Sequence, residues 1–97
     1  MLSIIIPAYQ DPYVQKTIDS LLASAQGKIE IIPVLDGYSL KQALKADKRV
    51  KPVEFAQNLG MRAAINAGLA RARGKFIMKC DAHCAFGEGY DKILTHN

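Results

Sequence analysis

The stretch LSIIIPAY, residues 2–9, is the strongest structural signal in the chain. The five residues from Leu2 to Ile6 are apolar except for one serine, which is typical of a short strand buried on both faces. Pro7 is expected to end this strand, because proline lacks the backbone N–H that a sheet ladder uses. Buried strands of this kind occur in sheets that are covered by helices on both sides.

The next segment has the spacing of an amphipathic helix. Asp11 is the expected N-cap, with Pro12 at the first helical position and Gly27 as the stop signal. Apolar residues recur every three or four positions, which predicts one buried stripe along the helix. That stripe comprises Val14, Ile18, Leu21, Leu22 and Ala25.

Three further helices are expected after this one. Asn58 is the expected cap of the longest one, which ends at Gly74. Its inner face is expected to comprise Met61, Ile65, Gly68, Leu69 and Ala72. A short helix is expected at residues 39–46, and another is expected to begin near Tyr90.

Three more strand-like runs follow the first, at residues 29–35, 50–55 and 76–80. Pro33 and Pro52 interrupt two of them, and each removes a ladder donor. The connections between runs are long enough for parallel crossovers. The sequence therefore predicts an open, mainly parallel α/β sheet flanked by helices.

Polar residues follow three of these runs. Tyr9 comes after the first, Asp36 after the second, and Asp81 with His83 after the fourth. In open α/β sheets, ligands bind outside the carboxyl ends of the strands. The convergence of three strand ends therefore predicts a ligand site at that edge.

The composition is that of one small globular domain. Hydrophobic residues make up 49% of the 97 positions, which excludes a disordered chain because enough apolar surface is available to bury. The net charge of +4 suits an anionic ligand such as a nucleotide. The basic residues form no dense run, so nucleic acid is not an expected partner.

No apolar stretch approaches the roughly 18 residues that a membrane span requires. The run at residues 2–6 is also too short for the core of a signal peptide and has no basic leader. Cys80 and Cys84 do not form a disulfide framework. We therefore expect a cytoplasmic protein with reduced thiols.

These segments resemble glycosyltransferase family two, whose members have the GT-A fold, a Rossmann-like arrangement with a nucleotide-binding half. SIIIPAY at residues 3–9 is similar to the family's first strand and nucleotide loop, and VLDGYS at residues 34–39 to its second strand and turn. The family often has two adjacent aspartates in that turn, and Leu35 stands at the first of them. The third-helix pattern is represented by NLG at residues 58–60 and then by Ala64, Asn66, Gly68, Ala72 and Gly74.

The motif DAH at residues 81–83 departs from the Asp-x-Asp of family two. Together with Cys84, Gly89 and Tyr90, it resembles the polypeptide N-acetylgalactosaminyltransferases, which share the GT-A fold. Those enzymes usually have an acidic residue after the cysteine, where this chain has Ala85. Family two typically inverts configuration and the second group retains it, so the stereochemical outcome stays open.

The resemblance implies that the chain binds a UDP-sugar through a divalent metal. Such a cation stabilises the charge that develops on the departing diphosphate. Asp81 would contact the ribose or the metal, and His83 would ligate the metal. A carboxylate with an imidazole suits manganese better than magnesium, which favours oxygen ligands. Since a histidine must be neutral to ligate, metal binding is expected to weaken below about pH 6.5.

The resemblance also assigns the nucleotide-binding residues. Pro7, Ala8 and Tyr9 would line the base pocket, with the ring of Tyr9 stacked on the base. Asp36 would accept a hydrogen bond from the uracil ring nitrogen, and Arg62 would reach the diphosphate. Each has a simpler interpretation beside this one, because an exposed aromatic, a turn aspartate and a solvated helix arginine are common in any fold.

Residues 1–97 are expected to form the N-terminal, nucleotide-sugar-binding part of a glycosyltransferase domain. In the family, the acceptor-binding half follows the metal motif and supplies the catalytic base of inverting members, so the base stays unassigned here. The isolated chain is therefore expected to transfer hexosyl or N-acetylhexosaminyl groups weakly or not at all. The acceptor is unknown.

Other functions stay open. A non-catalytic nucleotide-binding or assembly module of the same fold would expose a sheet edge, which could drive formation of a homo-oligomer. A nucleotidyltransferase has a similar fold, but its glycine-rich and basic first loop is absent after Ile6. A structural zinc site is disfavoured, because Cys80, His83 and Cys84 supply only three local ligands.

Overall fold

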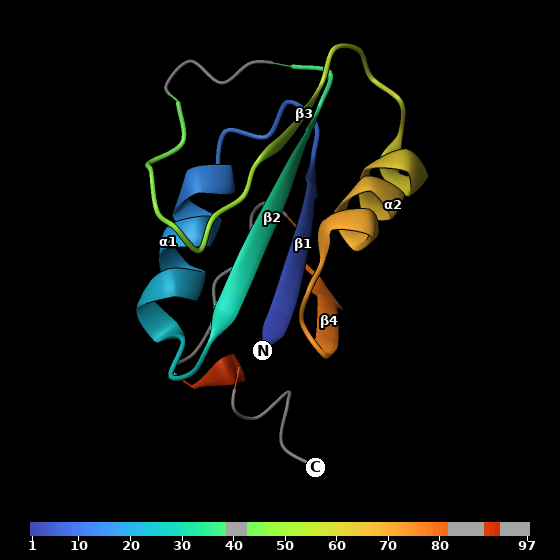
Figure 1. Cartoon of the computed structure of the whole chain (residues 1–97). Coiled ribbons are helices and arrows are strands. Elements are labelled where there is room, and N and C mark those ends of the chain that lie inside the picture. Colours follow the sequence, from blue (N-terminus) through green and yellow to red (C-terminus); the bar gives the residue numbers. More distant parts are fainter. Residues whose placement is uncertain (39–42, 82–88, 92–97) are drawn as a thin grey trace.

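The computed structural model describes residues 1–38, 43–81 and 89–91. Within these ranges the named helices and strands are, in chain order, β1 (Leu2–Ala8), α1 (Val14–Ser24), β2 (Ile29–Asp36), β3 (Val53–Phe55), α2 (Met61–Arg71) and β4 (Phe76–Lys79). Figure 1 shows the sheet between the two helices, with α1 on one face and α2 on the other. The result is a three-layer α/β arrangement, as the sequence predicts.

All strand pairs in this sheet are parallel, and the strand order is β3-β2-β1-β4. β1 is paired with β2 from Leu2–Ile29 to Ala8–Leu35, and with β4 from Leu2–Phe76 to Ile5–Lys79. The chain therefore leaves β1 toward one side and later returns to its other side. The carboxyl ends of β1 and β4 thus form the topological switch point, where sheets of this class bind ligands.

Both strands in the middle of the sheet run through a proline. β1 continues past Pro7 to Ala8, so the prediction that Pro7 ends the strand is wrong. The carbonyl of Ile5 accepts a hydrogen bond from Cys80, and Ile31 exchanges hydrogen bonds with Arg49 and Lys51. Along a strand, the backbone N–H and C=O groups of residues i and i+2 face the same neighbouring strand. Pro7, two residues after Ile5, therefore faces β4, and Pro33, two residues after Ile31, faces the β3 side. Neither proline therefore removes a donor from the β1–β2 ladder.

The first helix begins two residues later than predicted. Its N-cap is Tyr13, and Asp11 instead accepts a hydrogen bond from the Tyr13 amide at 2.8 Å in the turn before the helix. An aspartate can stabilise such a turn as readily as it caps a helix. The predicted stripe is confirmed, because Val14, Ile18 and Leu21 are buried while Leu22 and Ala25 pack against the same core.

The second helix packs on the opposite face through small residues. It begins at Met61, with Gly60 rather than Asn58 as its N-cap. The predicted inner face is partly wrong, because Ala64 and Gly68 are buried whereas Met61 and Leu69 are 57% and 44% exposed. A Cβ added to Gly68 would lie 2.5 Å from Cγ2 of Ile5. This close approach to β1 selects small residues and turns the larger ones outward.

Several shorter predictions have mixed outcomes. Residues 43–46 are not helical, so the helix predicted at 39–46 is wrong there, while residues 39–42 lie outside the described ranges. The run at residues 50–55 is reduced to β3, with Val50 forming an isolated bridge to Ile31. The backbone at Tyr90 and Asp91 is helical, as expected. None of the helices in the described ranges is long and apolar enough to cross a membrane.

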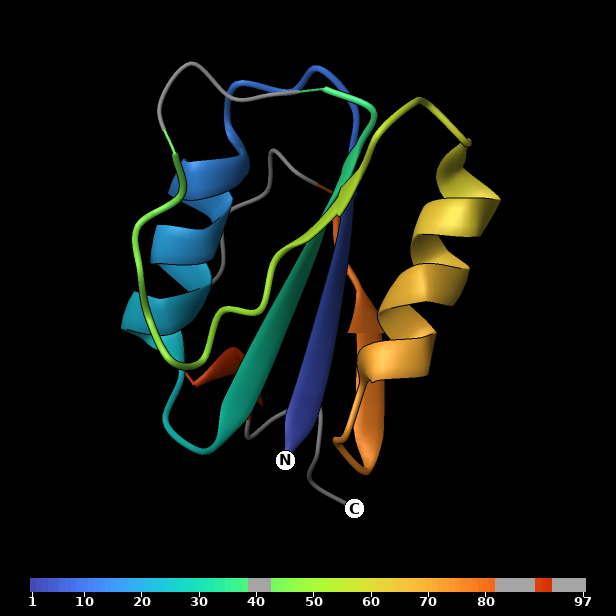
Figure 2. The same cartoon turned by 45° about the horizontal axis from the view of Figure 1, so that its top comes forward.

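Residues 89–91 lie beside the C-terminal end of α1, as both Figure 1 and Figure 2 show. The hydroxyl of Tyr90 donates to the carbonyl of Leu21 at 2.9 Å. The Asp91 carboxylate accepts hydrogen bonds from the amides of Gln26 and Gly27 at 2.8 and 2.6 Å. These contacts connect positions about 65 residues apart and hold the turn between α1 and β2.

Candidate functional site

Four of the site residues predicted from the sequence lie at the carboxyl edge of the sheet. Tyr9 directly follows β1, Asp36 is the last residue of β2, and Asp81 is the second residue after β4. Arg62 is exposed in the first turn of α2, and the amino end of this helix lies at the same edge (Figure 1). The topology therefore brings these four residues to one side of the molecule.

Tyr9 is 52% exposed and has a second aromatic ring beside it. The rings of Tyr9 and Tyr38 lie edge to face, with centroids 6.3 Å apart and planes at 86°. Tyr38 is half-buried and packs against the core between α1 and the sheet. Burial is the main reason that the pKa of Tyr38 lies above its usual value, so its hydroxyl is a neutral donor. Sequence reasoning missed Tyr38, whose only signal is its place in the turn two residues past Asp36.

The turn after β1 contains a strained residue. Gln10 has φ of 54°, in the left-handed region that residues with a Cβ rarely occupy. The flanking Asp11 is fixed twice, since its side chain accepts from the Tyr13 amide and its carbonyl accepts from the Tyr38 hydroxyl at 3.4 Å. Such strained turns persist only where surrounding contacts determine them.

Asp36 is buried and holds the turn that precedes α2. Its carboxylate accepts hydrogen bonds from the amides of Leu59 and Gly60 at 2.7 and 2.9 Å, and from Nδ2 of Asn58 at 3.1 Å. A carboxylate has about four acceptor positions, so three of them are used within the protein. The predicted hydrogen bond from uracil would use the one that remains, and it stays a prediction.

Gly37 completes this connection between β2 and the turn at residues 58–60. Its φ of 76° lies in the left-handed region, and an added Cβ would lie 2.1 Å from the Asn58 nitrogen. Only glycine therefore allows the two backbones to approach this closely. The Asp36-Gly37 pair, predicted as a simple turn, also orders a segment about 20 residues later.

The remaining nucleotide-binding predictions concern the end of β1. Pro7 is half-buried, and Ala8 is buried in the core shared by α1 and the sheet. Their contact with a base stays a prediction.

Asp81 is exposed beside the switch point. Its backbone carbonyl lies 3.1 Å from Sγ of Cys80, which is buried. Its predicted partner His83, like Cys84, lies outside the described residues. Among residues 1–38, 43–81 and 89–91, no group of three or more His, Cys, Asp or Glu residues is arranged to hold a metal ion. An exposed carboxylate at this edge is chemically suited to manganese or magnesium.

A buried polar network lies at the opposite end of the sheet. Glu30 accepts hydrogen bonds from the Ser3 hydroxyl, the Lys51 ammonium and the Arg73 amide at 2.5, 2.7 and 2.5 Å. Burial alone would raise the pKa of Glu30, but these hydrogen bonds and the Lys51 charge lower it to about 2. The Ser3 hydroxyl also accepts from the Gly74 amide, so the network fixes the connection from α2 to β4. We assign it a structural role.

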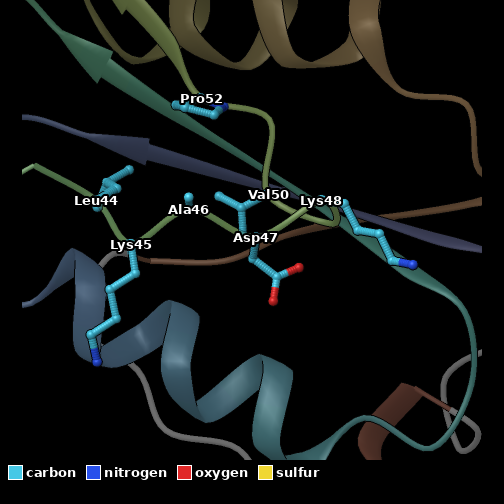
Figure 3. A pocket seen from close by; sticks show the side chains of 7 residues that line it. All are labelled: Leu44, Lys45, Ala46, Asp47, Lys48, Val50 and Pro52. Atoms are coloured by element: carbon cyan, nitrogen blue, oxygen red, sulfur yellow. The ribbon is translucent and has the colours of Figure 1, made fainter.

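A surface hollow of about 610 Å³ lies away from the carboxyl edge. Figure 3 shows its lining side chains along the segment that leads from β2 to β3. Lys45 reaches toward α1, where its ammonium lies 3.4 Å from the Asp19 carboxylate. The lining comprises Leu44, Lys45, Ala46, Asp47, Lys48, Val50 and Pro52, and includes none of the predicted site residues.

Comparisons with known proteins agree with this geometry. The sequence profile described as Glycosyl transferase family 2 matches residues 3–94. An uncharacterized glycosyltransferase of Haemophilus influenzae is 31% identical over 104 residues, which cover 99% of this chain and 32% of that protein.

Two Bacillus subtilis proteins are also similar. The uncharacterized glycosyltransferase EpsJ is 37% identical over 79% of this chain and 24% of its own length. The putative glycosyltransferase CsbB is 29% identical over 98% of this chain and 36% of its own length. The chain thus spans about a third or less of the length of these relatives.

Proposed function

The chain belongs to glycosyl transferase family 2, and we propose that it forms the donor-binding part of an enzyme that transfers a sugar from UDP to an acceptor. The observation that carries this proposal is the strand order, in which β1 lies between β2 and β4. The carboxyl ends of β1 and β4 therefore border the crevice where open α/β sheets bind nucleotides. Because the chain spans about a third or less of the length of its relatives, the transferase activity of a full-length enzyme is also a proposal.

The base of the nucleotide would bind against the end of β1. Half of the Tyr9 side chain is exposed, which leaves ring surface for stacking on uracil. Pro7 and Ala8 would form the floor of this pocket. Asp36 would use its remaining acceptor position for the uracil ring N–H, while its other hydrogen bonds keep the turn before α2 in place.

The diphosphate would bind between the end of β4 and the amino end of α2. Asp81 and His83 would hold a divalent metal, with manganese preferred over magnesium because one ligand is an imidazole. When bound, that cation would supply charge stabilisation to the leaving diphosphate. Arg62 would approach the same diphosphate from the first turn of α2, where backbone amides also favour anions.

The donor is proposed to carry a hexose or an N-acetylhexosamine, as the polypeptide N-acetylgalactosaminyltransferase-like motif at residues 81–83 suggests. The described residues of this edge bind and orient the donor, and we assign none of them as the catalytic base. The isolated chain would accordingly bind UDP but transfer sugar weakly.

Calorimetric titration of UDP with and without manganese tests this proposal. We expect metal-dependent binding that is lost in His83→Ala and at least tenfold weaker in Asp81→Asn. Asp47→Asn, a carboxylate variant on the β2–β3 connection, serves as the control and should bind as the wild type. Absence of metal-dependent UDP binding in the wild-type chain would contradict the proposal.

A competition experiment separates this function from nucleotidyl transfer. A glycosyltransferase should prefer the intact UDP-sugar to UTP in the presence of manganese. The reverse preference would favour a nucleotidyltransferase, whose reaction begins from the triphosphate.

One observation favours a second candidate, the assembly module. Ile77 on β4 is 50% exposed, and within the described residues β4 is paired only with β1. An apolar edge strand can pair with a second copy of the chain. Sedimentation analysis of the 97-residue chain should give a dimer or larger species if this candidate is correct, and a monomer if it is not.

A further inference from the structure

We infer that Tyr38 is a positioning residue for the nucleotide base, acting through the ring of Tyr9. The inference rests on the proposed function, since it concerns the base pocket of the same site. The base pocket predicted from the sequence comprises the end of β1 and Asp36. Tyr38, in the turn after β2, is an additional residue.

Tyr38 contacts both ends of the turn that follows β1. Its ring meets the ring of Tyr9 edge to face, with centroids 6.3 Å apart. Its hydroxyl donates to the backbone carbonyl of Asp11 at 3.4 Å. One side chain from the turn after β2 thus contacts residues on both sides of Gln10.

Gln10 explains why this turn needs such support. Its φ of 54° lies in the left-handed region, which costs a residue with a Cβ about 1–2 kcal/mol. A turn with that cost would relax if its flanking residues were not held. On the helix side, Asp11 accepts from the Tyr13 amide. On the side of the base pocket, the ring of Tyr38 packs against Tyr9 and restrains it.

Tyr38 is itself fixed, because it is half-buried and packs against the core beneath α1. Tyr9 is 52% exposed, so its side chain would otherwise sample several rotamers. Ordering a free side chain on binding lowers affinity, whereas a ring that is already ordered avoids this loss. Tyr38 therefore increases base affinity without contacting the base.

The ring and the hydroxyl of Tyr38 can be separated by substitution. In Tyr38→Phe the ring is retained, and we expect UDP affinity within about threefold of the wild type. In Tyr38→Leu the aromatic contact is lost, and we expect the dissociation constant for manganese-UDP to rise about 3- to 10-fold. Affinity for manganese-pyrophosphate, which has no base, should not change. Tyr13→Leu, which replaces an exposed tyrosine beside the same turn, is the control and should not change UDP affinity.

A double-mutant cycle tests whether Tyr38 acts through Tyr9. In a Tyr9→Leu background, Tyr38→Leu should cause no further loss of UDP affinity, because the ring it positions is absent. An equal loss in both backgrounds, or equal losses for UDP and pyrophosphate, would overturn the inference. So would unchanged UDP binding by Tyr38→Leu. If the wild-type chain binds no UDP, the proposed function itself fails. If it binds UDP and Tyr38→Leu binds equally well, only the inference about Tyr38 fails.

Discussion

The carboxylate of Asp36 accepts a hydrogen bond from the amide of Leu59 at 2.7 Å, across 23 positions of sequence. This contact connects the carboxyl end of β2 to the turn that starts α2. Both segments border the edge of the sheet where Tyr9 and Asp81 stand. Asp36 therefore organises the proposed site as well as belonging to it, and its replacement should affect folding before it affects ligand binding.

Asp36→Ala is expected to destabilise the protein. The amides of Leu59 and Gly60 would lose their acceptor, and a hydrogen bond to a charged group such as this carboxylate contributes about 1.5–3 kcal/mol. Urea unfolding followed by circular dichroism measures this loss. Glu54→Gln, an exposed substitution in β3, should change stability by less than about 0.5 kcal/mol. Equal stabilities for the wild type and Asp36→Ala would refute the assigned role.

Gly68→Ala should also be destabilising, although alanine favours helices by about 1 kcal/mol. The new methyl group would lie 2.5 Å from Cγ2 of Ile5, a buried side chain in β1. Overpacking of this kind costs about 1–3 kcal/mol. An Ile5→Ala background removes the clash, so there Gly68→Ala should be neutral or stabilising by thermal melting. The same cost in both backgrounds would show that the close approach of α2 to β1 is not its cause.

Glu30 should make the free energy of unfolding depend on pH. Its pKa is about 2 in the folded chain against an ordinary value of 4.5, so the unfolded chain takes up the proton first as pH falls. The stabilisation is therefore complete above about pH 4.5 and is lost toward pH 2, by at most about 3 kcal/mol. Urea unfolding of the wild type and Glu30→Gln between pH 2 and 7 should show two curves that converge in acid. Curves separated by a constant gap would contradict this.

Asp91 is expected to protect the turn between α1 and β2. Asp91→Ala removes the acceptor of the Gln26 and Gly27 amides, so both should exchange with solvent about 10-fold faster. Amide hydrogen exchange measured by NMR reads each position separately. The Ile31 amide, in the middle of β2, should keep its rate. Faster exchange throughout the chain would indicate global destabilisation instead of a local role.

Much of the fold follows from local sequence patterns. β1 and β2 are recognisable because their residues are apolar almost without interruption, and the buried stripe of α1 follows from its spacing. The parallel sheet follows from the alternation of strands and helices. These features are predictable because each depends on residues close together in sequence.

Features that depend on distant residues were not predictable. Asn58 has the residue type of a helix cap, but it donates to Asp36, which lies 22 positions earlier. The inner face of α2 is set by the contact of Gly68 with Ile5 rather than by hydrophobicity. Pro7 and Pro33 look disruptive in the sequence, yet each faces away from the hydrogen-bond ladder between β1 and β2.

The candidate site divides in the same way. The parallel direction of β1, β2 and β4 brings Tyr9, Asp36 and Asp81 to one edge of the sheet, as predicted. The contact of Tyr38 with Tyr9 arises where two turns meet in space, so no local motif reveals it. The UDP-sugar donor, the metal, the role of His83, the cytoplasmic location and the oligomeric state stay predictions.

The central claim is that nucleotide and metal bind at the carboxyl edge of the sheet, and paramagnetic broadening tests it most directly. Manganese added with UDP to the isotopically labelled chain should broaden the amide signals of Tyr9, Gly37 and Asp81. Those of Lys28 and Lys75, at the amino ends of β2 and β4, should stay sharp. Broadening centred on the amino ends, or none when UDP and manganese are present together, would contradict the account.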